Sequence, residues 1–167
     1  MTLAVKLWIV DGQNNLPGSI ARLMLRSATR NGNGIVEIGD LRVEELDVPG
    51  QAVVVRDGAF IARGAEEVWQ GSYWGYNIGD EQVTLSATGS SGPRSDLVYL
   101  RIEDPTVSGA GWDHDPDTDP KAYFVVKEGV SANTTTIPSG ETGIPLARID
   151  RDASTGTVTQ DNIVDLR

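Results

Sequence analysis

The chain has no cysteine, a single histidine among its 167 residues, and no long apolar run. The absence of cysteine excludes disulfides and thiolate chemistry, so stability must come from packing or from neighbouring subunits. No stretch approaches the roughly 20 apolar residues that cross a bilayer, so we expect no membrane insertion. The apolar run at the N-terminus contains Lys6 and stops at Asp11, which predicts synthesis in the cytoplasm without a signal peptide.

Basic side chains are also scarce. The chain has 14 lysines and arginines against 24 aspartates and glutamates, which gives a formal net charge of −10. A nucleic acid, which carries dense negative charge, would be repelled by such a protein at long range. We therefore expect no nucleic-acid partner.

Glycine and short apolar runs are abundant. The chain has 19 glycines and 8 prolines, and turn-forming residues separate most of its apolar runs. Short apolar runs at regular spacing are typical of antiparallel sheets. The sequence therefore predicts a mainly β protein, an antiparallel β-sandwich or barrel with one short N-terminal α-helix. The expected strands cover residues 3–10, 35–38, 41–46, 52–55, 59–62, 83–87, 97–102, 122–126, 144–149 and 157–164.

The expected helix covers residues 20–27. Ile20, Leu23, Met24 and Ser27 fall on one helical face, and Ser19 can cap the first turn. Glycines and asparagines at 31–34 end the helix and mark a soft boundary. We predict an arm at residues 1–34, with a strand and a helix that dock on neighbouring proteins, followed by a β-sandwich domain at residues 35–167.

No catalytic motif is present in the sequence. It contains no P-loop, no dinucleotide fingerprint, no nucleophile elbow and no zinc-protease motif. A catalytic histidine needs a nucleophile and an orienting partner, and His114 has no such companions in a recognisable motif. We therefore predict no catalytic residues, no cofactor and no enzymatic activity.

His114 lies in a loop where carboxylates occupy every second position. Such oxygens can bind a hard cation, but calcium loops also need a glycine at the sharp turn and a distal glutamate. This loop has neither, and two prolines stiffen it. A solvated acidic loop is the preferred interpretation, and the weak metal candidates are Asp113, Asp115, Asp117 and Asp119.

Four aromatic residues lie close together in the sequence: Trp69, Tyr73, Trp74 and Tyr76. Aromatic rings dominate protein cores and interfaces, which makes a core or subunit-interface role the favoured interpretation. Such rings also stack on sugars, so a carbohydrate site is the alternative, with a host-surface glycan as its ligand.

Charged residues accompany the strands predicted near 97–102 and 144–149. Val98, Leu100 and Ile102 form an apolar face of the first strand, and Arg101 lies on the other. We predict a structural charge network that fixes sheet register or crosses between subunits, formed by Arg94, Asp96, Arg101, Arg148 and Asp165.

Several segments in the range 50–167 resemble one protein family. Residues 93–104 (PRSDLVYLRIED) resemble the pattern P-R-x-D-L-V-x-x-R-V-x-D of minor tail proteins from phages of actinobacteria. Residues 144–149 (IPLARI) and 161–167 (DNIVDLR) are similar to that family's ending, and residues 122–129 resemble its middle strand. Residues 52–64 and 71–77 fit its opening.

The resemblance implies a virion structural protein located in the tail: a minor tail, baseplate or fibre-base subunit, made in the host cytoplasm. Its expected partners are other phage tail proteins and copies of itself, in a trimer or a higher symmetric assembly. The family often carries a receptor-binding domain after the D-L-R ending, and this sequence stops there. The alternatives are a glycan-binding adhesin, a cell-wall hydrolase and a capsid decoration protein.

Overall fold

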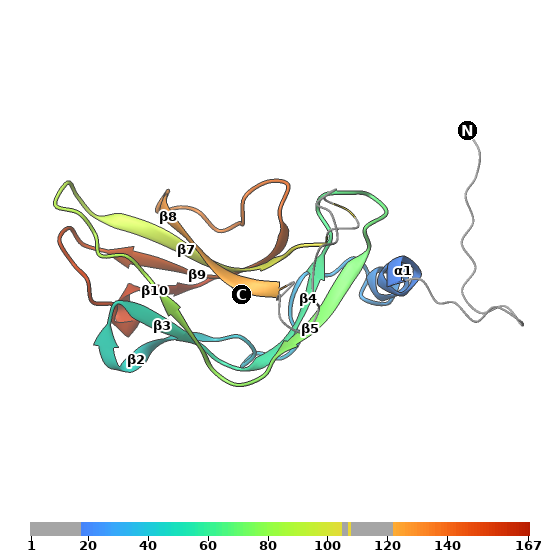
Figure 1. Ribbon diagram of the computed structural model, residues 1–167, viewed down its shortest axis with the longest axis horizontal. Helices are drawn as coiled ribbons and strands as arrows, with labels where there is room; N and C mark the ends of the chain where they lie inside the picture. Colours follow the sequence, from blue (N-terminus) through green and yellow to red (C-terminus); the bar gives the residue numbers. More distant parts are fainter. Residues whose placement is uncertain (1–17, 105–106, 108–121) are drawn as a thin grey trace, which may run out of the picture.

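The structure, a computed structural model, describes residues 18–104, 107 and 122–167. These residues form three antiparallel sheets and one α-helix, which confirms the mainly β prediction (Figure 1). The elements are α1 (Gly18–Ala28), β1 (Gly34–Ile35), β2 (Val43–Gly50), β3 (Ala52–Val55), β4 (Gly58–Arg63), β5 (Ser72–Asn77), β6 (Glu81–Thr84), β7 (Arg94–Ile102), β8 (Ala122–Val130), β9 (Thr142–Arg151), the 3₁₀-helix η1 (Gln160–Asn162) and β10 (Ile163–Asp165).

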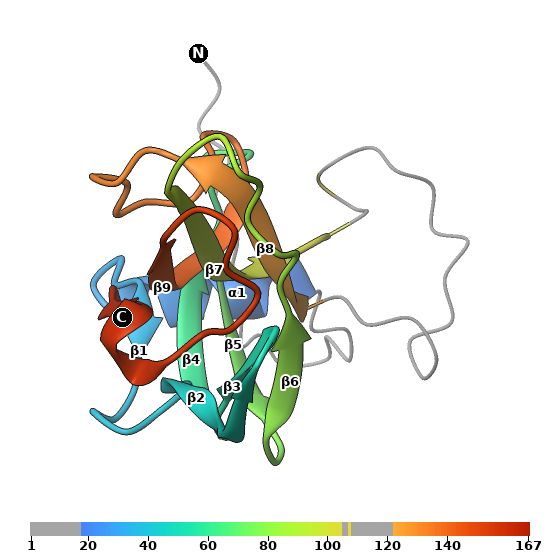
Figure 2. The same ribbon diagram turned by 90° about the vertical axis from the view of Figure 1, so that its left-hand side faces the viewer.

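The largest sheet has the strand order β10-β9-β7-β8, and it faces the sheet β2-β3-β6 across the core (Figure 1). The third sheet, β1-β4-β5, stands at one end of these two layers (Figures 1 and 2). Within the described residues the sheets do not close on one another. Of the two predicted architectures, the sandwich agrees with the structure and the barrel is wrong.

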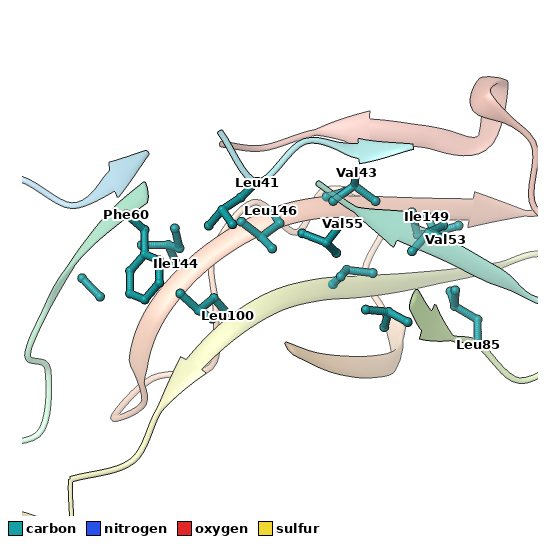
Figure 3. Packing of buried hydrophobic residues seen from close by; sticks show 14 of the residues in the cluster. Leu41, Val43, Val53, Val55, Phe60, Leu85, Leu100, Ile144, Leu146 and Ile149 are labelled. Atoms are coloured by element: carbon teal, nitrogen blue, oxygen red, sulfur yellow. The ribbon is translucent and has the colours of Figure 1, made fainter. Parts of the chain in front are cut away.

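The core contains buried side chains from all three sheets (Figure 3). Val98, Leu100 and Ile102 of β7 belong to it, as their alternation predicted. Phe60 of β4 extends the core toward the third sheet, where it lies near Ile144 of β9. Full burial of an aliphatic or aromatic side chain contributes about 1.5–3 kcal/mol. Burial of side chains in this shared core is therefore the main contribution that holds the three sheets together.

The central pair β7 and β9 contains an irregularity at Pro145. The register shifts by one residue between the pairs Val98↔Ala147 and Tyr99↔Pro145. Proline has no amide proton for a ladder hydrogen bond and is tolerated in sheets at such bulges. The extra residue turns β9 so that both Leu146 and Ala147 are buried in the core.

The predicted strands vary in accuracy. Residues 52–55 match β3, whereas the run at 35–38 shrinks to the two residues of β1. Strand β5 was not predicted, because Gly75 interrupts its apolar pattern and its aromatic residues were interpreted as a cluster. The predicted strand at residues 3–10 lies outside the described residues.

The helix agrees with the prediction at residues 20–27, but Ser19 lies inside α1 and does not cap it. Met24 and Ser27 are exposed, although the predicted apolar face included both. The helix lies on the side of the β1-β4-β5 sheet that faces away from the core, beside β5 (Figures 1 and 2). Docking of the arm on neighbouring proteins stays a prediction. No helix in the described parts of the chain has the length and apolar character to span a membrane.

Candidate functional site

The outer face of the β1-β4-β5 sheet exposes two large aromatic side chains. Trp74 and Tyr76 of β5 remain 62% and 50% exposed, respectively, and they alternate with residues that point toward the core. Their partners on β4 are Ile61 and Ala59, which lie on the same face because directly paired residues share a side. The result is an uncharged strip of aromatic and aliphatic side chains on a hydrogen-bonded strand pair.

Gly75 explains why this strand turns its aromatic residues outward. Gly75 pairs with Phe60, and a side chain on Gly75 would collide with the Phe60 ring. The core side of β5 therefore has no room for a large residue at this position. Because the side-chain period of a strand is two, the neighbouring Trp74 and Tyr76 must face away from the core.

Tyr73 has a different role from its two neighbours. Its hydroxyl donates to the Asp104 carboxylate at 2.6 Å and accepts from Gln70 at 3.1 Å. The guanidinium of Arg22 lies 5.3 Å from the centre of its ring and forms an ion pair with Asp104 at 3.3 Å. Burial, and then the hydrogen bond to Asp104, raise the pKa of Tyr73 well above its ordinary value. Tyr73 therefore belongs to a structural polar cluster and not to the exposed strip.

The same polar cluster holds the loop between β4 and β5 against β9. The buried side chain of Gln70 donates to the Thr142 hydroxyl at 3.1 Å and accepts from the Glu66 amide at 3.0 Å. The Thr142 hydroxyl also accepts from the Ala65 amide at 3.1 Å. Trp69 lies in this loop, is 48% exposed and is not part of the strip. The four predicted aromatic residues are thus divided among a loop, a buried cluster and the outer face.

Helix α1 is attached to this region through Arg22 and Gly71. The Arg22 guanidinium donates to the Gln70 carbonyl at 3.0 Å. Gly71 has φ +84°, and a Cβ atom there would lie 2.6 Å from the Arg22 backbone. The close approach of the helix therefore requires glycine at this position.

Carboxylates surround Tyr76 at one end of the strip. The Tyr76 hydroxyl donates to Asp57 at 3.4 Å. The negative charge of Asp57 is the main cause that raises the pKa of Tyr76, and Asp40 and Glu37 add to it. No ion pair joins these three carboxylates to a basic side chain of the described residues. This end of the strip is therefore acidic.

The five residues of the predicted charge network do not gather in one place. The structure brings Arg94 and Asp96 together at 2.8 Å. The other three have partners that were not in the prediction: Arg101 pairs with Glu103 and Glu141, Arg148 with Asp150, and Asp165 with Arg167.

Sequence reasoning missed Arg151, the second partner of Asp96. The two side chains are fully buried and form an ion pair of 2.6 Å. Asp96 also accepts from the Gly129 amide at 3.0 Å. A one-residue bulge in β9 places Arg151 opposite Arg94 at the end of the β7-β9 ladder. Only the long-range register reveals this contact, so the local sequence carried no signal for it.

A groove of about 580 Å³ opens between the edge strands β6 and β8. Its walls include the apolar side chains of Phe60, Val83 and Phe124, and its one charged lining residue among those described is Glu81. Glycoside hydrolysis uses two carboxyl groups about 5–10 Å apart. The groove therefore does not supply the pair that a cell-wall hydrolase of that mechanism requires.

Within the described ranges, no group of three or more histidine, aspartate or glutamate side chains could hold a metal ion. The weak metal candidates Asp113, Asp115, Asp117 and Asp119 lie outside the described residues, as does His114. Comparison with known proteins found no matching family model, no matching curated protein and no matching solved structure.

Proposed function

We propose that the chain is a non-enzymatic structural subunit of a tailed-bacteriophage virion, located in the tail as a minor tail, tail-tip or fibre-base protein. The observation that carries the contact role is the strip on the outer face of the third sheet, in which Trp74 and Tyr76 are exposed beside the partly buried Ile61. The virion and the tail come from the resemblance of residues 50–167 to minor tail proteins.

The strip supports a protein contact for physical reasons. Exposure of large apolar side chains to water is unfavourable, and clustered examples are typical of interaction sites. Tryptophan and tyrosine are enriched among the residues that dominate interface energies. The strip lies on paired strands, so little backbone ordering is needed on binding. Its proposed partners are other tail proteins and copies of the chain.

The test uses purified particles of the virus that encodes the chain. We expect the protein to co-purify with particles at a fixed copy number, and gold-labelled antibodies against it to mark the tail. Label on the head would instead identify a capsid decoration protein. Absence of the protein from particles would overturn the proposed function.

Carbohydrate binding is the second candidate. Trp74 and Tyr76 are two residues apart on one strand face, so their side chains are about 7 Å apart along the strand. Exposed rings in such a row can stack on successive sugars. Glycan-array or cell-wall binding that disappears in Trp74→Ala would favour this function, and retention of particle incorporation by that variant would separate it from the structural role.

A further inference from the structure

The end of the strip opposite to the acidic residues is basic. Most arginines among the described residues form ion pairs with carboxylates, but Arg26, Arg30 and Arg63 form none there. Arg26 instead donates to the Val68 carbonyl at 2.7 Å and to Asn31 at 2.8 Å. The loop that follows Arg63 also contains Glu66 and Glu67, so the three arginines leave this end with a small net positive charge.

The pairing of β4 with β5 fixes where the two charged ends lie. Arg63 ends β4 opposite Ser72, while Asp57 immediately precedes β4, next to the pair Gly58↔Asn77. Arg63 lies six positions after Asp57, which corresponds to about 20 Å along a strand. Arg63 is on the same face as Ile61 and Trp74, because residues two apart on a strand share a side.

The remaining arginines lie near the same end. Asn33 accepts from the Arg63 amide at 2.9 Å, and α1 leads through Arg30 into this segment. One face thus has a basic end, a central uncharged strip with Trp74, and an acidic end near Tyr76.

We propose that this face binds the same face of a second copy of the chain, in a two-fold symmetric dimer. A two-fold contact brings the same patch of both subunits together. An antiparallel arrangement places the basic end of each copy on the acidic end of the other, with the aromatic strips in the centre. Both ends and the strip lie on one face, so a copy that engages all of them must use this same face. The inference rests on the proposal that the strip is a protein contact.

The charges at the two ends of the strip favour a second copy of the chain over an uncharged apolar partner. Two copies with net charge −10 repel each other, so self-association needs local complementarity. Unpaired arginines at one end and unpaired carboxylates at the other provide it without any further protein.

The size of the face sets the expected affinity. Strands β4 and β5, each about 20 Å long at about 4.8 Å spacing, the two residues of β1 and the adjoining helix give a patch of roughly 400–500 Å² per subunit. An interface of about 1,000 Å² in total is at the small end of specific contacts, where complexes are weak or transient. The dimer is therefore expected at micromolar concentrations, and measurements must extend to hundreds of micromolar.

The experiment reverses charge at one end at a time and measures mass by sedimentation equilibrium. The first variant, Arg30→Glu with Arg63→Glu, makes both ends acidic. The second, Glu37→Arg with Asp57→Arg, makes both ends basic. Each variant alone should dissociate at least about tenfold more readily than the wild type, because like charges then meet at both ends of the contact.

An equimolar mixture of the two variants supplies the matched control. Each acidic end then meets a basic end, so the mixture should recover dimers of wild-type affinity that contain one copy of each variant. These positions are on the surface, and a thermal melt of each variant checks that it folds.

Three outcomes would overturn the dimer: a wild type that stays monomeric, one that forms trimers or larger rings, or a mixture that fails to recover dimers. A monomer that is still present in viral tails would leave the proposed function intact. A protein that dimerises but is absent from particles would overturn the proposed function and leave the dimer intact. The two proposals therefore fail separately.

Discussion

Asp96 is the most constrained charged residue of the sandwich. It is fully buried and contacts Arg94, Arg151 and the Gly129 amide. Arg151 depends on it, because its Nε and Nη1 atoms have no hydrogen-bond partner among the described residues. Charged groups are rarely buried without a partner, since their desolvation is costly. The Asp96–Arg151 pair therefore fixes the end of the β7-β9 ladder. Its main effect is that loss of one partner would leave the other charge buried and unpaired, which costs more free energy than the attraction of the pair contributes.

Asp96→Ala should lower the free energy of unfolding by about 3–5 kcal/mol, because it leaves the Arg151 charge buried and unpaired. The control is Asp150→Ala, which removes the carboxylate partner of Arg148. This ion pair is partly exposed, so its loss should lower the free energy of unfolding by less than about 1 kcal/mol. Urea unfolding of both variants provides the comparison. Similar losses for the two would contradict the account.

Acid should weaken the fold through Asp150. Hydrogen bonds from Arg148 hold the pKa of this carboxyl below its ordinary value. Its contribution is complete above the unfolded pKa of about 3.9, and it is lost as the pH falls through the lower folded pKa.

The melting temperature of Asp150→Asn should therefore fall less than that of the wild type between about pH 5 and pH 2. Arg148→Gln removes the main cause of the lowered Asp150 pKa and should flatten the profile similarly. Profiles as steep as that of the wild type in both variants would exclude this pair as a source of acid sensitivity.

At the scale of elements, local patterns predicted the strands that are flanked by turn residues. Residues 52–55 form a short apolar run and residues 20–27 follow a helical period, and both agree with the structure. Strand β5 was not predicted, because the need for Gly75 comes only from contact with Phe60, a residue 15 positions earlier in the chain. Long-range register decides which side of a strand is buried, and a shift by one residue exchanges the two faces.

The same reason limits what could be predicted about the candidate site. Sequence reasoning identified the four aromatic residues together. It could not separate Tyr73 from Trp74 and Tyr76, because that division follows from the pairing of β5 with β4. The charged ends of the strip, which come from segments distant in sequence, were missed for the same reason.

Gly71→Ala should detach α1 from the sheet. The added methyl group would collide with the Arg22 backbone, and φ +84° is unfavourable for alanine. Gly79→Ala is a matched control with φ +81° and open space around the Cβ position, so it tests backbone strain alone.

Amide hydrogen exchange of α1 distinguishes the two variants. We expect faster exchange throughout α1 in Gly71→Ala, whereas Gly79→Ala should lose about 1 kcal/mol of stability and keep the protection of the helix. Equal protection of α1 in both variants would show that Gly71 does not hold the helix.

At the scale of the whole molecule, one core joins all three sheets. A single substitution in this core should therefore lower the free energy of unfolding of all three sheets together. Leu146→Ala removes a fully buried side chain of β9 and should cost about 2–5 kcal/mol in a single unfolding transition. Val48→Ala changes a side chain that is 80% exposed and should cost less than about 0.5 kcal/mol. Two separate transitions in chemical unfolding would contradict a shared core.

The described residues thus combine a continuous core with a surface that is partly apolar. The core explains why the outer face of β1-β4-β5 can keep a fixed shape while it exposes Trp74 and Tyr76. Contact with other proteins is the role that such a face supports best, and the proposed tail location gives it neighbours.

The central claim is that this aromatic face is a protein contact, and mass in solution tests it most directly. Sedimentation equilibrium from about 1 to several hundred micromolar would compare the wild type with Trp74→Ser/Tyr76→Ser and with Val48→Ser, which removes an exposed apolar side chain of β2. We predict that the wild type and Val48→Ser form dimers and that the double variant stays monomeric. A double variant that forms dimers as readily as the wild type would contradict the claim.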